Sequence, residues 1–204
     1  MNTVINKSVN LQSLSDEDVM EQLQAGNMQA FDILVSRFKD RLHNFLFRYT
    51  HNHEDCEDLV QETFFRVFKS RHSYTRIAKL STWIYTIALN LAKSMYKKKQ
   101  RMSTVSMHAD PNNPEDFDFE VEDTAILQDE ELHQKFCVEQ LELALLDLND
   151  DFREAIILRD IQQLTYEEIA EITGSAMGTV KSRINRGRIQ LQEILKDYVQ
   201  QETI

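Results

Sequence analysis

The sequence predicts an all-α protein built from two small helical domains joined by a flexible acidic linker. Glycine and proline, which interrupt helices, are scarce, with 4 and 2 residues among 204. No long segment alternates apolar and polar residues with the period of two that marks a half-buried strand. Both prolines, Pro111 and Pro114, lie in one acidic stretch. We therefore expect an N-terminal tail over 1–14, a first domain over 15–101, the linker over 102–134 and a second domain over 135–204.

Four helices are predicted in the first domain. Ser15 with Asp18 three residues on predicts a capping box, and Gly26 ends that short helix. The second helix is marked by apolar residues at helical spacing, namely Phe31, Leu34, Val35, Phe38, Leu42, Phe45, Leu46 and Tyr49. A third helix starts near Glu54, and the polar stretch 70–79 separates it from a fourth that runs over about 80–99.

The formal net charge of −11 conceals a strong segregation of charge along the chain. Residues 71–101 contain eight Lys or Arg and no acid, whereas residues 102–134 contain ten acids and no Lys or Arg. Residues 175–192 contain four basic residues and no acid. Local basic stripes are the electrostatic footprint of a nucleic-acid-binding protein. The acidic segment buries too little apolar surface to fold alone, which favours a linker.

Residues 165–191 have the pattern of a helix-turn-helix. In the first helix, TYEEIAEI, Ile169 and Ala170 face inward, and Gly174 follows where a tight turn needs positive φ. At 100° per residue, one side of the second helix carries Val180, Ile184, Gly187 and Leu191. The opposite side carries Lys181, Ser182, Asn185, Arg186 and Ile189, with Arg183 and Arg188 at its edges. Polar groups therefore point to where a major groove would lie, with cations placed for phosphates.

The fourth helix of the first domain carries two stripes. Trp83, Ile84, Ile87, Leu91 and Met95 form an apolar stripe, and Thr86, Asn90, Lys93 and Lys97 form a polar stripe beside it. The basic loop before this helix contains Tyr74, Arg76 and Lys79. An aromatic ring, an amide and cations suit an unstacked base of single-stranded DNA. A core tyrosine beside a solvated lysine face explains the same residues equally well.

Two motifs in the same order resemble those of the extracytoplasmic-function (ECF) sigma factors. The run with Asp55, Glu57, Asp58, Leu59, Gln61, Glu62 and Phe64, followed by STWIYTIALNLAKS at 81–94, resembles their region 2. LTYEEIAEITGSAMGTVKSRINRGR at 164–188 resembles their region 4. The resemblance covers about residues 15–100 and 136–198. It implies a sigma region 2 helical bundle and a sigma region 4 helix-turn-helix.

The resemblance also implies roles for individual residues. Docking on the coiled coil of the largest polymerase subunit would involve Asp55, Asp58, Gln61 and Glu62. Recognition and melting of the −10 element would involve the loop with Tyr74, Arg76 and Lys79, together with Asn90. With them we assign to this site the other residues of the polar stripe, Thr86, Lys93 and Lys97. Recognition of the −35 element would involve Lys181, Ser182, Asn185 and Arg186, which match the family's reading positions. With them we assign to this site the neighbouring Thr179, Arg183 and Arg188 of the same helix.

The turn of the second motif departs from the family pattern. Ser175 and Ala176 follow the glycine where an apolar residue and often a proline are usual, and Thr173 stands where leucine is common. We expect a looser turn, with Ser175 as a candidate cap of the second helix. These changes do not touch the side of the helix that would face DNA.

Several classes of protein are disfavoured by the sequence. There is no phosphate-cradling glycine loop and no HExxH pair, so we expect no enzyme, cofactor or metal site. Cys56 and Cys137 form no CxxC pair. No apolar run approaches the roughly 20 residues of a membrane span, and Met1 to Asn10 lack a signal-peptide core. We expect a cytoplasmic protein that is not itself membrane-embedded.

The implied function is that of an alternative sigma factor, monomeric when free, that directs core RNA polymerase to specific promoters. Its implied partners are the coiled coil of the largest polymerase subunit, the flap of the second-largest subunit, promoter DNA as duplex and melted strand, and an anti-sigma factor that can hold it at the inner membrane. One alternative is a sigma-like decoy that binds an anti-sigma factor without promoter activity. Another, a free-standing helix-turn-helix regulator, explains only the C-terminal half.

Overall fold

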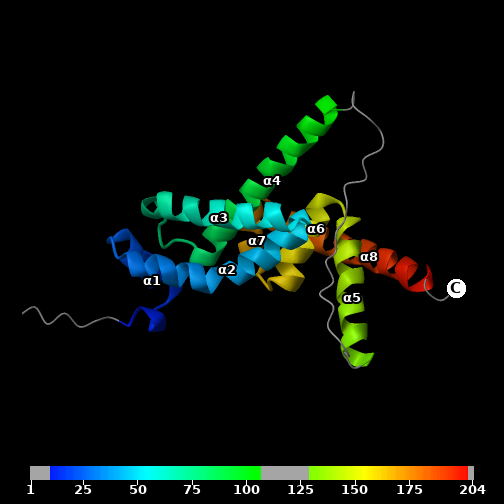
Figure 1. Cartoon of the computed structure of the whole chain (residues 1–204), viewed down its shortest axis with the longest axis horizontal. Helices are drawn as coiled ribbons and strands as arrows, with labels where there is room; N and C mark the ends of the chain where they lie inside the picture. The colour runs from blue at the N-terminus through cyan, green and yellow to red at the C-terminus, as the bar shows by residue number, and fades with distance from the viewer. Residues whose placement is uncertain (1–9, 107–128, 202–204) are drawn as a thin grey trace, which may run out of the picture.

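The computed structural model describes residues 10–106 and 129–201, and these residues form helices and no strands (Figure 1). The N-terminal lobe contains α1 (Asp16–Gln24), α2 (Met28–Thr50), α3 (His53–Lys69) and α4 (Leu80–Ser106). The C-terminal lobe contains α5 (Asp129–Leu146), α6 (Asp150–Ile156) with a π-type turn over Ile157–Ile161, α7 (Tyr166–Thr173) and α8 (Met177–Gln201). The all-α prediction is confirmed.

Helix boundaries in the N-terminal lobe follow from capping residues. The Ser15 hydroxyl accepts a hydrogen bond from the backbone N–H of Asp18, and Gly26 adopts a φ of 95° directly after α1. Asn27 and Asn52 cap α2 and α3 in the same way, by accepting from backbone N–H groups. These caps satisfy donors that have no partner inside a helix. The first cap and the glycine stop were predicted and are confirmed.

The helices extend further than predicted at both ends of the linker. α4 continues to Ser106 and α5 begins at Asp129, so both enter the range assigned to the linker, of which 107–128 lies outside the described residues. The segment assigned to the N-terminal tail also contributes structure from residue 10 onward. Leu11 is buried, and the guanidinium of Arg37 donates hydrogen bonds to the carbonyls of Leu11, Gln12 and Leu14. Residues 1–9 lie outside the described residues.

The C-terminal lobe depends on a buried arginine. Arg153 on α6 is 6 % exposed and donates hydrogen bonds to the backbone carbonyls of Leu145, Leu146 and Leu148. The carbonyls of Leu145 and Leu146 lie at the C-terminal end of α5, where a helix has acceptors without partners, and that of Leu148 lies in the turn that follows. A cation at this end is also favoured by the helix dipole. Arg153 therefore fixes α5 relative to α6.

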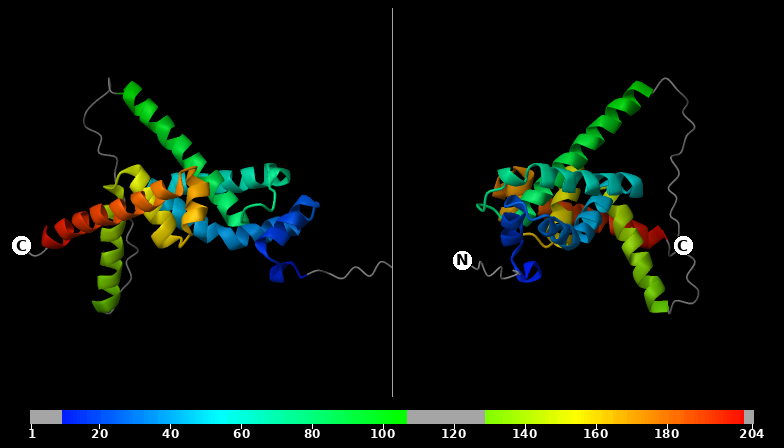
Figure 2. Two further views of the ribbon diagram at one scale, coloured as in Figure 1. Left: turned by 180° about the vertical axis from the view of Figure 1, so that it is seen from behind. Right: turned by 60° about the vertical axis from the view of Figure 1, so that its left-hand side comes forward.

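The two lobes pack against each other, an arrangement that the sequence did not predict. α7 lies against α4, whereas the C-terminal half of α4 projects away from the body (Figures 1 and 2). One continuous apolar cluster joins the lobes, since Ile84 and Leu89 belong to the same core as Leu158, Ile169 and Val180. α2 also approaches α5, where Arg48 lies 3.5 Å from the carboxylate of Glu142.

Candidate nucleic-acid interface

The exposed side of α8 is the first candidate surface. Val180 and Ile184 are buried, and Gly187 packs so closely on α6 that an added Cβ would lie 3.1 Å from Ile156 and 3.2 Å from Phe152. The opposite side is open to solvent and carries Thr179, Lys181, Ser182, Asn185, Arg186, Arg188 and Ile189. The predicted division of this helix into a core side and a polar side is confirmed.

The turn between α7 and α8 has the predicted left-handed glycine, but Ser175 has a different role from the one expected. Gly174 adopts a left-handed φ of 62°, and Thr165 and Glu168 form a reciprocal capping box at the start of α7. Ser175, however, was expected to cap α8. Its hydroxyl instead accepts a hydrogen bond from Arg183 at 3.0 Å. The turn is therefore held by a side chain of α8 itself.

The cations at the edges of α8 have partners within the lobe. Arg183 pairs with Asp151 on α6, and Arg188 pairs through two nitrogens with Asp160. The ammonium of Lys181 lies 5.7 Å from the centre of the Tyr166 ring. These contacts pre-position the cations around Asn185 and Arg186, whose side chains remain exposed.

The polar stripe of α4 divides into a free part and an occupied part. Asn90 and Lys97 are exposed. The hydroxyl of Thr86 donates to the carbonyl of Thr82, which satisfies it within the helix. The Lys93 ammonium lies 2.7 Å from the carboxylate of Glu154 on the other lobe. Only part of the stripe is therefore available to a ligand in this conformation.

Tyr74 does not occupy the place expected of a base-stacking ring. Its side chain is 6 % exposed, packs 5.4 Å from the Trp83 ring and donates a hydrogen bond from its hydroxyl to the carbonyl of Ala78. Burial raises the pKa of this phenol. The expectation of an open aromatic loop is wrong here, because the ring completes the apolar core beneath the loop. Of the two explanations left open by the sequence, the structure favours the core tyrosine.

The loop of residues 75–79 is exposed above this ring. Arg76 pairs with Asp18 and Glu21 on α1, which holds the loop against the first helix. Ile77 is 93 % exposed, which is unusual for an isoleucine and was not predicted from the sequence. A cleft of about 630 Å³ lies beside the loop and is lined by Leu14, Ser15, Asp16, Glu17, Arg37, Arg76, Ile77, Ala78, Lys79 and Ser81. Neither Tyr74 nor Asn90 lines this cleft.

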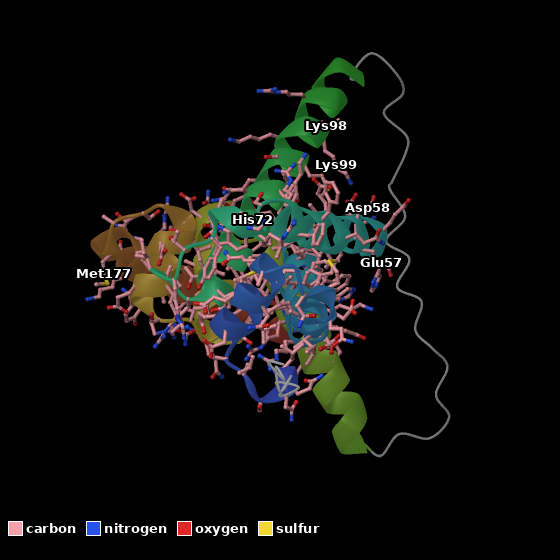
Figure 3. All side chains as sticks on the ribbon, turned by 90° about the vertical axis from the view of Figure 1, so that its left-hand side faces the viewer. Glu57, Asp58, His72, Lys98, Lys99 and Met177 are labelled. Atoms are coloured by element: carbon pink, nitrogen blue, oxygen red, sulfur yellow. The ribbon has the colours of Figure 1, made fainter. Side chains whose placement is uncertain are left out.

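The exposed side of α3 carries the residues assigned to polymerase docking. Asp58 and Gln61 are exposed, and Figure 3 shows Asp58 beside Glu57 at the edge of the lobe. Glu62 pairs with Arg66 one turn along the helix, and Asp55 pairs with Lys99 of α4. Phe65 is 56 % exposed on the same side, next to Lys69. Phe65 was not predicted from the sequence, although an aromatic at this spacing from Asp58 and Gln61 lies on the same side of the helix.

No metal site and no membrane-spanning helix is found among these residues. The described ranges contain no cluster of three or more histidine, cysteine or acidic side chains suited to holding a metal ion. None of the helices, over their described residues, is long and apolar enough to cross a bilayer. Cys56 is buried, and burial raises the pKa of its thiol to about 12, so it is an unreactive core residue.

Comparison with known proteins identifies both lobes. Residues 34–102 match the family model of Sigma-70 region 2, and residues 138–191 match that of Sigma-70, region 4. The chain is 32 % identical over 186 residues to the ECF RNA polymerase sigma-E factor of Haemophilus influenzae, covering 89 % of this chain and 95 % of that protein. It is 37 % identical over 169 residues to the ECF RNA polymerase sigma factor SigE of Mycolicibacterium smegmatis. That match covers 82 % of this chain and 62 % of SigE, less than two thirds of its length.

A solved structure is similar over most of the chain. It is that of the sigma factor RpoE in complex with the anti-sigma factor NepR from Bartonella quintana. The TM-score is 0.63 at 29 % sequence identity, and the match covers 81 % of this chain and 96 % of the solved chain. The similarity therefore extends over both lobes rather than over one helical motif.

Proposed function

Because the chain belongs to the ECF group of the sigma-70 family, we propose that it binds core RNA polymerase and directs promoter-specific initiation of transcription. The observation that carries the proposal is the exposed side of α8. Lys181, Asn185 and Arg186 lie together there, and residues 175–192 contain no acid. A decoy that only binds another protein has no need of such a surface.

The C-terminal lobe would place α8 in the major groove of the −35 element. Amide and guanidinium groups such as those of Asn185 and Arg186 form bidentate hydrogen bonds with base edges. Arg183 and Arg188 lie at the edges of the same surface, where the phosphate backbone passes in a helix-turn-helix complex. The flanking arginines would exchange their aspartate partners for phosphates on binding.

The N-terminal lobe would hold the melted −10 element. Asn90 and Lys97 are exposed on α4, and the loop of residues 75–79 presents Ile77 beside the cleft. An unstacked base entering beside this loop would meet an apolar side chain and the cations Arg76 and Lys79. Tyr74 would support the loop from below. The chemistry of nucleotide addition would belong to the polymerase, and this chain would act by positioning.

The partners follow from the same assignment. Asp58, Gln61 and Phe65 would contact the coiled coil of the largest polymerase subunit, and the C-terminal lobe would contact the flap of the second-largest subunit. An anti-sigma factor is a further proposed partner, because the similar Bartonella quintana protein was solved with one. We place this activity in the cytoplasm, where the polymerase acts.

The decisive experiment combines the purified full-length chain with core polymerase and fragmented genomic DNA, followed by mapping of transcript 5′ ends. The proposal predicts discrete start sites, absent with core polymerase alone, that share one upstream sequence near −10 and another near −35. Start sites indistinguishable from those of core polymerase would refute it and favour the decoy.

A further inference from the structure

The polar side of α1 lies against the loop of residues 70–79, the −10 loop, which joins α3 to α4. Glu17, Glu21 and Gln24 are spaced three or four residues apart, so they share one side of this helix. The other side carries three apolar residues that are buried in the core, namely Val19, Met20 and Leu23. α1 contacts both the 3₁₀ turn at the start of the −10 loop and α4 at its end.

Gln24 holds the first half of the −10 loop. Its side-chain amide nitrogen donates one hydrogen bond to the carbonyl of Arg71 at 2.6 Å and another to the carbonyl of Tyr74 at 3.0 Å. A primary amide has two donor hydrogens, and this arrangement uses both. The two bonds are partly buried, which strengthens them relative to bonds made in open solvent. The backbone that carries the Tyr74 ring is thereby held against α1.

Glu17 holds the other end of the −10 loop by capping α4. The first N–H groups of a helix need acceptors from outside the helix. Lys79 directly precedes α4, and a lysine side chain has donors but no acceptor. The backbone N–H of Leu80, the first residue of α4, instead donates to the carboxylate of Glu17 at 3.0 Å. An anion at this end of a helix is also favoured by the helix dipole.

The tip of the −10 loop has a weaker connection to α1. The guanidinium of Arg76 lies 2.7 Å from the carboxylate of Asp18 and 3.4 Å from that of Glu21. The Arg76 side chain is 52 % exposed, and ion pairs in contact with solvent contribute little to stability. The partly buried hydrogen bonds of Gln24 and Glu17 therefore contribute more to the shape of the loop than this pair does.

α1 is anchored firmly enough to impose its position on the loop. Arg37 of α2 pairs with Asp16 in the first turn of α1 at 2.7 Å. The same guanidinium donates hydrogen bonds to backbone carbonyls of the segment that precedes α1. Val19 and Leu23 belong to the same buried cluster as core residues of α2 and α4. The helix is thus held on its apolar side and at its start, while its polar side holds the loop.

We propose that α1 is a positioning element for promoter opening: Glu17 and Gln24 hold the −10 loop at both ends, so that the loop and Asn90 on α4 meet the unstacked base in one fixed geometry. The inference rests on the proposed function in one respect, that this loop contacts the −10 strand. α1 precedes residues 34–102, the part of the chain that matches the region 2 family model. Glu17 and Gln24 act through the loop and through α4.

The order of the loop is measured first, in the free full-length chain, by hydrogen exchange of the backbone amides of residues 70–80. The test variant is Gln24→Met, which removes both donors but keeps an unbranched side chain of similar helix propensity. Exchange should become about fivefold faster or more, because two partly buried hydrogen bonds are lost. The matched control is Gln22→Met on the same helix, since the Gln22 side chain makes no hydrogen bond within residues 10–106 and 129–201. Its exchange should equal that of the wild type.

Promoter opening is then measured with the same two variants bound to core polymerase. Gln24→Met should slow formation of the open complex by about tenfold relative to Gln22→Met, because the groups that receive the base are misplaced. The defect should persist on a template whose −10 region is already unpaired, since strand separation is not the step affected. The affinity for core polymerase should equal that of the wild type, because the exposed side of α3 is unchanged.

A second pair of variants tests the cap that Glu17 provides. Glu17→Gln keeps a side-chain oxygen that can accept from the N–H of Leu80, whereas Glu17→Ala keeps no acceptor. Glu17→Ala should speed exchange over residues 70–80 and slow opening, and Glu17→Gln should restore both rates to within about threefold of the wild type. Equal losses in the two variants would mean that the negative charge, and not the cap, is required, which would overturn the assigned role.

The outcomes separate this inference from the proposed function. Equal exchange in Gln24→Met and Gln22→Met would refute the hold of α1 on the loop, whatever the transcription assay shows. Faster exchange in Gln24→Met combined with a normal rate of opening would refute the positioning role. A wild-type chain that starts no specific transcripts would refute the proposed function, and the exchange rates alone would then decide whether α1 holds the loop.

Discussion

The ammonium group of Lys79 and the carboxylate of Glu168 lie 2.7 Å apart, although the two residues are 89 positions apart in the sequence. The hydrogen bond to Glu168 raises the pKa of Lys79. Burial opposes ionisation of Glu168, but hydrogen bonds from Lys79 and Thr165 hold its pKa below the usual range. Both groups are therefore charged at neutral pH, and the pair joins the loop before α4 to the first helix of the helix-turn-helix.

Docking on polymerase is predicted to depend on the exposed side of α3. Asp58→Lys should weaken binding to core polymerase by about tenfold or more, because a cation replaces an anion at the proposed contact. Helix content should be unchanged, since Asp58 is exposed. Binding is measured by fluorescence anisotropy of the labelled full-length chain.

The matched control is Glu57→Lys, which makes the same change of charge one residue away on α3 and has no assigned contact. It should bind core polymerase within a factor of two or so of the wild type. If Asp58→Lys bound as tightly as Glu57→Lys does, the docking surface would be misplaced.

Recognition of the −35 element is predicted to distinguish two arginines of α8. Arg186→Ala should cost about 1–3 kcal/mol at one base pair and relax specificity there. Arg188→Ala should weaken binding to all sequences alike and lower the salt dependence, because Arg188 would contact phosphate. Affinities for a panel of single-base variants at two salt concentrations decide the matter. Uniform losses in both variants would be inconsistent with the assigned sides of the helix.

Opening of the −10 element is predicted to depend on Asn90. Asn90→Ala should slow formation of the open complex by about one to two orders of magnitude, as expected for loss of a bidentate amide contact. Tyr74→Phe should slow it by less than about tenfold, because the ring stays in the core and only the hydrogen bond to Ala78 is lost. Permanganate footprinting at a mapped promoter gives both rates. If the Asn90→Ala variant opened the promoter at the normal rate, the polar stripe of α4 would contact phosphates and no base.

The turn of the helix-turn-helix is predicted to require glycine at one of two nearby positions. Gly174→Ala should lower the free energy of unfolding by about 1 kcal/mol, since φ at this residue is 62°. Gly178→Ala, in open space in the first turn of α8, should leave stability unchanged or raise it slightly. Thermal unfolding of the two variants measures the difference. Equal losses would mean that chain flexibility, not the left-handed turn, matters here.

The periodic segments were predictable because helical spacing reports burial directly. Val180, Ile184 and Gly187 were placed on the core side of α8 from spacing alone, and the structure confirms this. The capping of α1 by Ser15 could also be predicted, because it depends only on residues three positions apart in the sequence. Helical spacing and capping residues depend on neighbouring residues in the chain and not on how the helices pack together.

The burial of Tyr74 and that of Glu154 could not be predicted from the sequence, for different reasons. Tyr74 lies outside any apolar repeat, yet the 3₁₀ turn before it and the short loop after it return the ring to Trp83. Glu154 is a charged residue on a short helix, where exposure is the usual expectation. In this structure it is buried and paired with Lys93 on α4 of the other lobe. Contacts between segments that are far apart in the chain produce no periodic pattern in the sequence, so they could not be predicted from it.

The proposed function places one chain on two promoter elements about two helical turns apart, so the two lobes should lie farther apart in the promoter complex than in the free chain. The most direct test is the distance between spin labels at His72 in the N-terminal lobe and Met177 in the C-terminal lobe, both exposed and labelled in Figure 3. The labels are attached to His72→Cys/Met177→Cys in a Cys137→Ser background and measured by double electron–electron resonance. We expect a single short distance for the free chain and an increase of several tens of ångströms, on the scale of the roughly 70 Å between elements, in the complex with core polymerase and promoter. The same distance in both states would contradict it.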